Sequence, residues 1–165
     1  MRRLAGERER RRLHETFATL CRIPSPSGDE RACADWITAA LQDLGLTVEE
    51  DDAGSATGGN AGNLLARMPG TGPDFILFCA HMDTVPLTAP VEPVQVDGGW
   101  ENANEGILGA DNKSAVAAIL ELARIVRSAP GLPQLGIELL FTVAEESGLR
   151  GAAEFDLGRL RSGCG

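Results

Sequence analysis

Two apolar stretches constrain the fold of this chain more than any other feature. They are DFILFCA, residues 74–80, and GIELLFTVA, residues 136–144. Short apolar runs bounded by turn residues are typical of buried strands. Residues 112–127, which lie between them, repeat apolar side chains at the spacing of one helix face. Helices that alternate with buried strands predict an α/β domain in which helices cover a sheet.

The rest of the chain continues this alternation. Further helices are expected at residues 8–21, from about residue 31 to Leu44, and from about Gly151 onwards. Ser27 or Asp29 would cap the second of these helices, and Gly45 would end it. LTVEED and NLLARM, residues 46–51 and 63–68, read as strands, whereas residues 86–105 read as irregular. The predicted fold is a three-layer α/β/α sandwich with a mixed, largely parallel sheet, incomplete at its C-terminal end.

The charge distribution divides the chain into a short basic start and an acidic body. The net charge is −9 over 165 residues, although residues 1–12 hold six arginines against two glutamates. We expect residues 1–12 to be a basic extension that starts a solvated helix, and residues 13–165 to form the domain. A nucleic-acid-binding arm is the less favoured alternative, because an acidic body repels phosphate. Nucleic acid is therefore not an expected partner.

Cysteine usage and hydropathy indicate a cytoplasmic protein. The four cysteines, Cys21, Cys33, Cys79 and Cys164, form no CxxC pair, which is typical of reduced thiols. Cys79 lies inside an apolar stretch and is expected to be buried. The N-terminus lacks the apolar region of a signal peptide, and no apolar run approaches the length that spans a membrane.

Titratable side chains follow the predicted strands at three junctions with loops or helices. His81 and Asp83 follow residues 74–80, and Asp111 precedes the helix at 112–127. Glu145 and Glu146 follow residues 136–144. Each has an ordinary explanation: a loop histidine, a helix N-cap, and a solvated acidic pair. Because strand ends share one edge in such sheets, their conjunction predicts a hydrolytic metal site of His, Asp and Glu ligands.

Four motifs in order resemble the M20-type metallopeptidases. They are IPSPSGDE, AHMDTVP, GADNKSAVA and FTVAEESGLRGA, at residues 23–30, 80–86, 109–117 and 141–152. The resemblance covers nearly the whole chain from about Leu13. It is to the N-terminal part of the catalytic domain, with the peptidase T (tripeptide aminopeptidase) branch as the best fit. The branch often has Asp-Asp where this chain has Asp111-Asn112.

The resemblance implies a role for each matching residue. His81 and Glu146 would each bind one of two zinc ions, with cobalt or manganese as alternatives. Asp111 would bridge the two ions, and the peptide bond that follows it is often cis. Glu145 would be the general base, and Asp83 would orient His81. The implied activity is hydrolysis of short peptides by a water activated by two metal ions.

The resemblance also implies parts that would lie beyond Gly165. These are two further metal ligands and a lid domain used for dimerisation, so a homodimer is expected only of the longer protein. We do not assign a ligand role to Asp156, and His14 is expected at the surface. The chain is therefore expected to be a partial catalytic domain with an exposed apolar sheet edge. Other M20 amidohydrolases, deacylases or carboxypeptidases, and an inert remnant, are the alternative functions.

Overall fold

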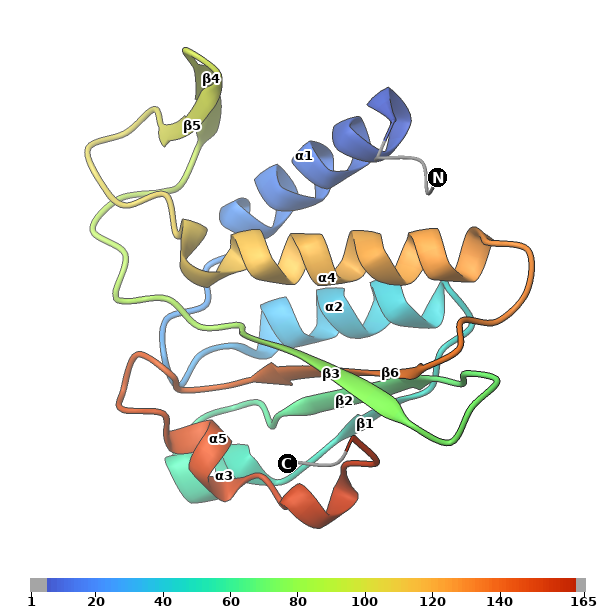
Figure 1. Ribbon diagram of the computed structural model, residues 1–165. Coiled ribbons are helices and arrows are strands. Elements are labelled where there is room, and N and C mark those ends of the chain that lie inside the picture. Colours follow the sequence, from blue (N-terminus) through green and yellow to red (C-terminus); the bar gives the residue numbers. More distant parts are fainter. Residues whose placement is uncertain (1–5, 163–165) are drawn as a thin grey trace.

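The computed structural model describes residues 6–162 and contains a central sheet with helices on both faces (Figure 1). The sheet has the spatial order β1-β2-β6-β3. Its strands are β1 (Val48–Glu50), β2 (Leu64–Met68), β6 (Gly136–Thr142) and β3 (Phe75–His81). β3 runs parallel to β6, whereas β1–β2 and β2–β6 are antiparallel. The sheet is mixed, as expected, but within residues 6–162 its parallel part is confined to β3 and β6.

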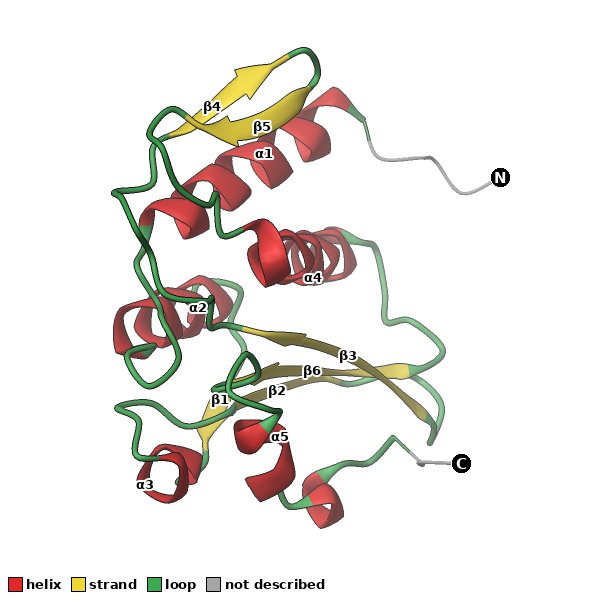
Figure 2. Ribbon diagram, turned by 90° about the vertical axis from the view of Figure 1, so that its left-hand side faces the viewer, coloured by secondary structure: helices red, strands yellow, loops and turns green. Residues whose placement is uncertain are grey.

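The helices form layers above and below this sheet, which confirms the α/β prediction. Figures 1 and 2 show α2 and α4 over one face, with α1 packed on the outer side of α4. The short helices α3 and α5 lie together beyond the other face. The bounds are α1 Glu7–Arg22, α2 Arg31–Gln42, α3 Ala53–Thr57, α4 Ala110–Ser128, α5 Arg150–Glu154 and the 3₁₀ helix Leu157–Arg159.

The main core lies between the sheet and the long helices. Its fully buried side chains come from both layers: Leu20, Ile37, Leu41, Leu64, Leu120, Leu139 and Phe141. Each such side chain stabilises the fold by about 1.5–3 kcal/mol relative to an exposed position. On α2, Ile37 and Leu41 are buried, whereas Ala32 near its start is exposed.

The start of α2 differs from the prediction. Neither Ser27 nor Asp29 caps the helix, because Glu30 occupies the N-cap position. The Ser27 hydroxyl instead donates to Asp83, and Asp29 accepts a hydrogen bond from Asn60. Gly45 does take the left-handed conformation expected beyond the helix end, with φ of 74°.

Residues 86–105 are not wholly irregular, since they contain a β-hairpin. Its strands are β4 (Pro93–Val96) and β5 (Gly99–Asn102), joined by Asp97 and Gly98 with positive φ angles of 50° and 81°. An Asp-Gly pair favours this tight turn, and that signal was overlooked. Trp100 fixes the hairpin on α1, because its Nε1–H donates to Nδ1 of His14 at 2.9 Å. His14 is exposed, as predicted.

Cys79 is exposed, so the prediction of a buried thiol is wrong. Among the strands of residues 6–162, β3 has a neighbour only on its β6 side, and its outward face is partly uncovered. Ile76 on the same strand is 41% exposed, in agreement with the expected apolar edge. An apolar run therefore marked the strand correctly but could not show how many neighbours the strand has.

Cys79 is expected to react with iodoacetamide in the folded protein, whereas Cys21 and Cys33 react only on unfolding. The reason is access, since Cys21 and Cys33 are buried whereas Cys79 is exposed. Burial raises the pKa of all three thiols, so the pKa does not distinguish them. Peptide mapping by mass spectrometry after brief labelling would locate the modified thiol. Labelling of Cys33 at the same rate as Cys79 would contradict this packing. A Cys79→Ser variant is the control.

In the part of the chain that the structure describes, none of the helices is both long and apolar enough to cross a membrane. Arg2 and Arg3, two of the six arginines of residues 1–12, and Cys164 lie outside the described residues.

Candidate metal centre

The structure brings the predicted site residues together at one edge of the sheet. His81 is the last residue of β3, and Thr142 beside it is the last residue of β6. Because the two strands are parallel, Glu145 and Glu146 emerge from β6 next to His81. Asp111 reaches the same place from the first turn of α4. Four side chains separated along the sequence therefore meet in one place.

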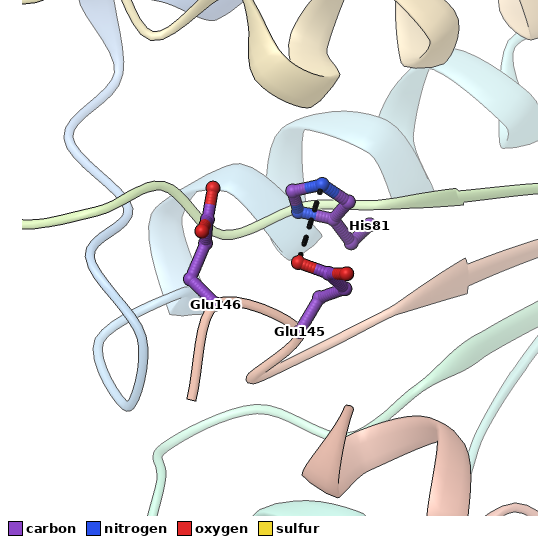
Figure 3. Close-up of side chains that lie close together, drawn as sticks. All are labelled: His81, Glu145 and Glu146. Carbon is purple, nitrogen blue, oxygen red and sulfur yellow. Dashed lines mark ion pairs between the residues drawn. The ribbon is translucent and has the colours of Figure 1, made fainter. Parts of the chain in front are cut away.

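The side chains of His81, Glu145 and Glu146 lie close enough to share one ion (Figure 3). One ligand atom from each of the three lies within 4.8 Å of the others. Nε2 of His81 lies 3.7 Å from Oε2 of Glu145 and 3.2 Å from Oδ1 of Asp111. The His81 side chain is 8% exposed and that of Asp111 is 83% exposed, so the site opens on the Asp111 side.

Asp83 is buried behind His81 and accepts hydrogen bonds from the backbone amides of Glu145 and Glu146, which follow β6. Its Oδ1 lies 3.2 Å from Nδ1 of His81 and 3.0 Å from the amide nitrogen of Glu145. Its Oδ2 accepts from the Glu146 amide at 3.0 Å and from the Ser27 hydroxyl at 2.6 Å. Burial raises the pKa of Asp83, but these donors outweigh it and hold that pKa below 3.8. Asp83 is therefore an anion fixed beside His81. This is the position that a residue orienting His81 would occupy.

The carboxylates around His81 make the site attractive to cations. Burial lowers the pKa of His81, but the hydrogen bond and charge of Asp83, with Glu145 and Asp111, raise that pKa to about 9. The same negative potential acts on any cation at Nε2. An imidazole with carboxylates, and no thiolate, is a donor set that suits zinc and similar ions in hydrolytic sites. The residues present therefore fit a divalent metal ion.

Three further features concern the Asp111–Asn112 peptide bond, Asp156 and the grouping of possible metal ligands. The Asp111–Asn112 peptide bond is cis, as the resemblance implied. Asp156 accepts a hydrogen bond from Gly158 at the 3₁₀ helix, so it serves a local turn. Within residues 6–162, one group of three or more His, Cys, Asp or Glu side chains lies close enough together to hold a metal ion. It consists of His81, Glu145 and Glu146.

Sequence reasoning missed several polar residues beneath the site. Glu30 and Asn63 are buried, and both accept hydrogen bonds from the backbone just after β6. Glu30 belongs to the motif IPSPSGDE, and its acidic side chain next to a glycine turn was the available signal. Lys113, the single lysine of the chain, is also buried, and its ammonium donates to the carbonyl of Ile23. Burial lowers the pKa of Lys113.

Gly151→Ala is expected to destabilise the protein by about 1–3 kcal/mol, because the added methyl group overpacks a closed space. A Cβ at Gly151 would lie 2.1 Å from the carbonyl oxygen of Val143, which is backbone and cannot rotate away. Val143 immediately precedes the turn that carries Glu145. Chemical denaturation would measure the loss, with Gly99→Ala as a comparison, since the nearest atom to a Cβ there is the Val96 carbonyl oxygen at 3.6 Å, an ordinary contact. Equal stabilities for both variants would contradict the close approach.

Comparison with known sequences agrees with this geometry. The model of peptidase family M28 matches residues 63–157, more than half of the chain. The protein YqjE of Bacillus subtilis is 38% identical over 147 residues, which are 88% of this chain and 39% of that protein. The cytosol non-specific dipeptidase of Escherichia coli is 31% identical over 154 residues, covering 85% of this chain and 29% of that enzyme.

Solved structures support the same relationship. The aminopeptidase PepT of Bacillus cereus superposes with a TM-score of 0.86 at 37% identity, over 92% of this chain and 41% of that one. A tripeptidase of Staphylococcus aureus gives 0.83 at 36% identity, over 91% and 40%. A dinuclear metal-binding peptidase of the M20 family from Bacillus subtilis shares the fold, with a TM-score of 0.66 at 18% identity, over 91% and 40%. This chain spans about two fifths of the length of these three structures.

Proposed function

Since the chain belongs to peptidase family M28 and is peptidase T-like in sequence and fold, we propose that it carries part of the catalytic centre of a zinc-dependent exopeptidase. The proposed substrates are short peptides with a free amino terminus, and the reaction is removal of a terminal residue. The proposed cofactors are two zinc ions, for which cobalt or manganese could substitute. The observation that carries the proposal is the meeting of His81, Asp111, Glu145 and Glu146 at the ends of β3, α4 and β6.

The proposed role of each site residue follows from its position. His81 and Glu146 would each hold one ion, and Asp111, which is largely exposed, would reach both. Asp83 keeps His81 oriented, because its carboxylate is itself held by three other donors, the Ser27 hydroxyl and the Glu145 and Glu146 amides. When bound, two such ions would polarise the scissile carbonyl and lower the pKa of a bound water to roughly 7.

Glu145 would move the proton. Its carboxylate lies beside His81 and is 34% exposed, so it faces the open side of the site. It would accept a proton from the attacking water and pass it to the amine that leaves. Glu146 is the next residue and is directed to the same space, where it would hold an ion instead of moving the proton (Figure 3).

Tripeptide hydrolysis would test the function directly. The 165-residue chain and the product of the complete gene would be assayed with zinc or cobalt, on a tripeptide and on its N-acylated form. Cleavage of the free tripeptide alone supports the aminopeptidase. Cleavage of the acylated form would favour a deacylase or carboxypeptidase, and inactivity of both proteins with metal would contradict the proposal. Activity only in the gene product would show that further residues complete the site.

We also propose a cytoplasmic location and the absence of nucleic-acid or membrane partners. The name of the Escherichia coli relative, a cytosol dipeptidase, and the acidic net charge of −9 support this. A homodimer is proposed for the longer protein only.

A further inference from the structure

Four consecutive backbone amides at the exit of β6 are each bound by a side-chain oxygen. Val143 N–H donates to Oδ1 of Asn63 at 3.1 Å, and Ala144 N–H donates to Oε1 of Glu30 at 3.0 Å. The Glu145 and Glu146 amides donate to the two oxygens of Asp83, both at 3.0 Å. The run therefore has a complete set of acceptors that comes from outside β6.

The three acceptors are buried and come from separate parts of the chain. Glu30 begins α2, Asn63 precedes β2, and Asp83 follows β3, and none is more than 1% exposed. Asn63 is held in turn, since its Nδ2 donates to Asp51 at 2.8 Å and to the Gly151 carbonyl at 2.9 Å. Ser27 holds Asp83 from the same loop that leads to Glu30.

These side-chain oxygens accept the hydrogen bonds that a neighbouring strand would accept if the sheet continued. The pairing of β6 with β3 ends at Thr142, so the next amides have no strand partner. Ala144 has a φ of 52°, a left-handed conformation that a residue with a Cβ adopts only when its surroundings enforce it. Buried amides without acceptors would destabilise this turn. The acceptors thus select this turn, and the turn aims Glu145 and Glu146.

We propose that Glu30 and Asn63 directly, and Ser27 through Asp83, are positioning residues for Glu145 and Glu146. They touch neither substrate nor metal, and they act by fixing the backbone from Val143 to Glu146. The inference rests on the proposed function for the roles of the two glutamates. Its structural part, the control of this turn by the three side chains, can be tested in the metal-free chain.

The decisive comparison is Glu30→Gln against Glu30→Met. Glutamine keeps an oxygen that accepts from the Ala144 amide, whereas methionine has a similar size and no such acceptor. We expect Glu30→Met to speed hydrogen exchange of the Ala144, Glu145 and Glu146 amides by on the order of tenfold relative to those of β2. We expect it to weaken zinc binding, measured by titration with Zn²⁺ alone, by about 10–100-fold. Glu30→Gln should stay close to the wild type in both.

Ile37→Val is the matched control for a purely structural effect. It lies on the same helix, is fully buried, and loses one methylene group. It should lower the stability of the fold. It should not change zinc affinity, nor the exchange of the Ala144, Glu145 and Glu146 amides relative to those of β2. The proposal is overturned if Glu30→Met keeps wild-type exchange and affinity. It is also overturned if Glu30→Gln fails as badly as Glu30→Met, because charge and not the hydrogen bond would then be the cause.

A second pair of variants covers the case in which Glu30→Met does not fold. Ser27→Ala removes only the hydroxyl that donates to Asp83, and Ser27→Thr retains one. Ser27→Ala should speed hydrogen exchange of the Glu145 and Glu146 amides, whereas Ser27→Thr should keep the wild-type exchange rate. Ser128→Ala, at an exposed position, should have no effect on this exchange. Equal exchange in all three would overturn the proposal. If the wild type binds no zinc, the proposed function fails, while the exchange measurements still decide whether these residues fix the turn.

Discussion

Glu145→Gln is expected to lower peptide turnover by about 10²–10⁴-fold in the form of the protein that hydrolyses peptides, while metal binding remains. The amide is nearly the same size as the carboxylate but cannot take a proton from water. Its oxygen can still face His81, which lies 3.7 Å from Oε2 of Glu145. Steady-state kinetics on a tripeptide, together with zinc content by elemental analysis, would measure both effects. The loss should fall on kcat, since Glu145 would act on the reacting atoms.

His81→Ala is the contrasting variant for this experiment. It removes the imidazole at the centre of the cluster, so metal content and turnover should fall together. Exposed Glu154→Ala, on α5, is the control and should change neither. If Glu145→Gln keeps wild-type turnover, Glu145 is not the base. If it loses its zinc, Glu145 is a ligand and another residue must carry the proton.

Glu138→Ala is expected to destabilise the fold by about 1–3 kcal/mol, because several donors lose their acceptor, although Arg67 keeps its ion pair with Glu49. The Glu138 side chain is fully buried on β6, where Oε1 accepts from Nε of Arg67 at 2.9 Å. The same carboxylate accepts from the amides of Arg161 and Ser162 at 3.0 and 2.8 Å, and so holds the chain that follows α5 against the sheet. Urea denaturation would measure the loss.

The effect of Glu138 should depend on pH in a defined direction. Burial raises the pKa of this carboxyl, but the Ser162 and Arg161 amides, the Ser162 hydroxyl and Arg67 outweigh it, so the pKa lies below 4.5. A carboxyl whose pKa is lower in the folded than in the unfolded state stabilises the fold fully at any pH above its unfolded-state pKa. This stabilisation is lost as the pH falls through its folded-state pKa. The stability difference between the wild type and Glu138→Ala should therefore be largest near pH 7 and become smaller below pH 4.5.

Glu138→Gln is the matched variant for the charge. It keeps one acceptor oxygen for the Arg161 and Ser162 amides but removes the ion pair with Arg67. We expect a smaller loss than for alanine, and a difference from alanine that does not vary between pH 3 and 7. A Glu138→Ala protein as stable as the wild type would show that the carboxylate is not needed to hold residues 159–162.

Much of the site could be predicted because each predicted residue stands in a distinctive local position. His81, Asp111, Glu145 and Glu146 all occur where an apolar run or a helical pattern begins or ends, and parallel strands bring such ends to one edge. The hairpin at Pro93–Asn102 was missed although Asp97-Gly98 signalled it, because its flanking strands are short and largely exposed. Cys79 was placed wrongly because apolar composition does not reveal which strand has an open side.

The sequence by itself determined the α/β class, the positions of the long helices and the main strands, and the chemical type of the site. These follow from periodicity and residue chemistry, which are local properties of the chain. Only the tertiary structure decided that Glu30, Asn63 and Asp83 hold the turn of Glu145 and Glu146, and that Ser27 binds Asp83 instead of capping α2. These contacts join residues 56 to 114 positions apart. No local pattern encodes them, because a buried amide N–H donates to any acceptor oxygen that the folded chain brings to it.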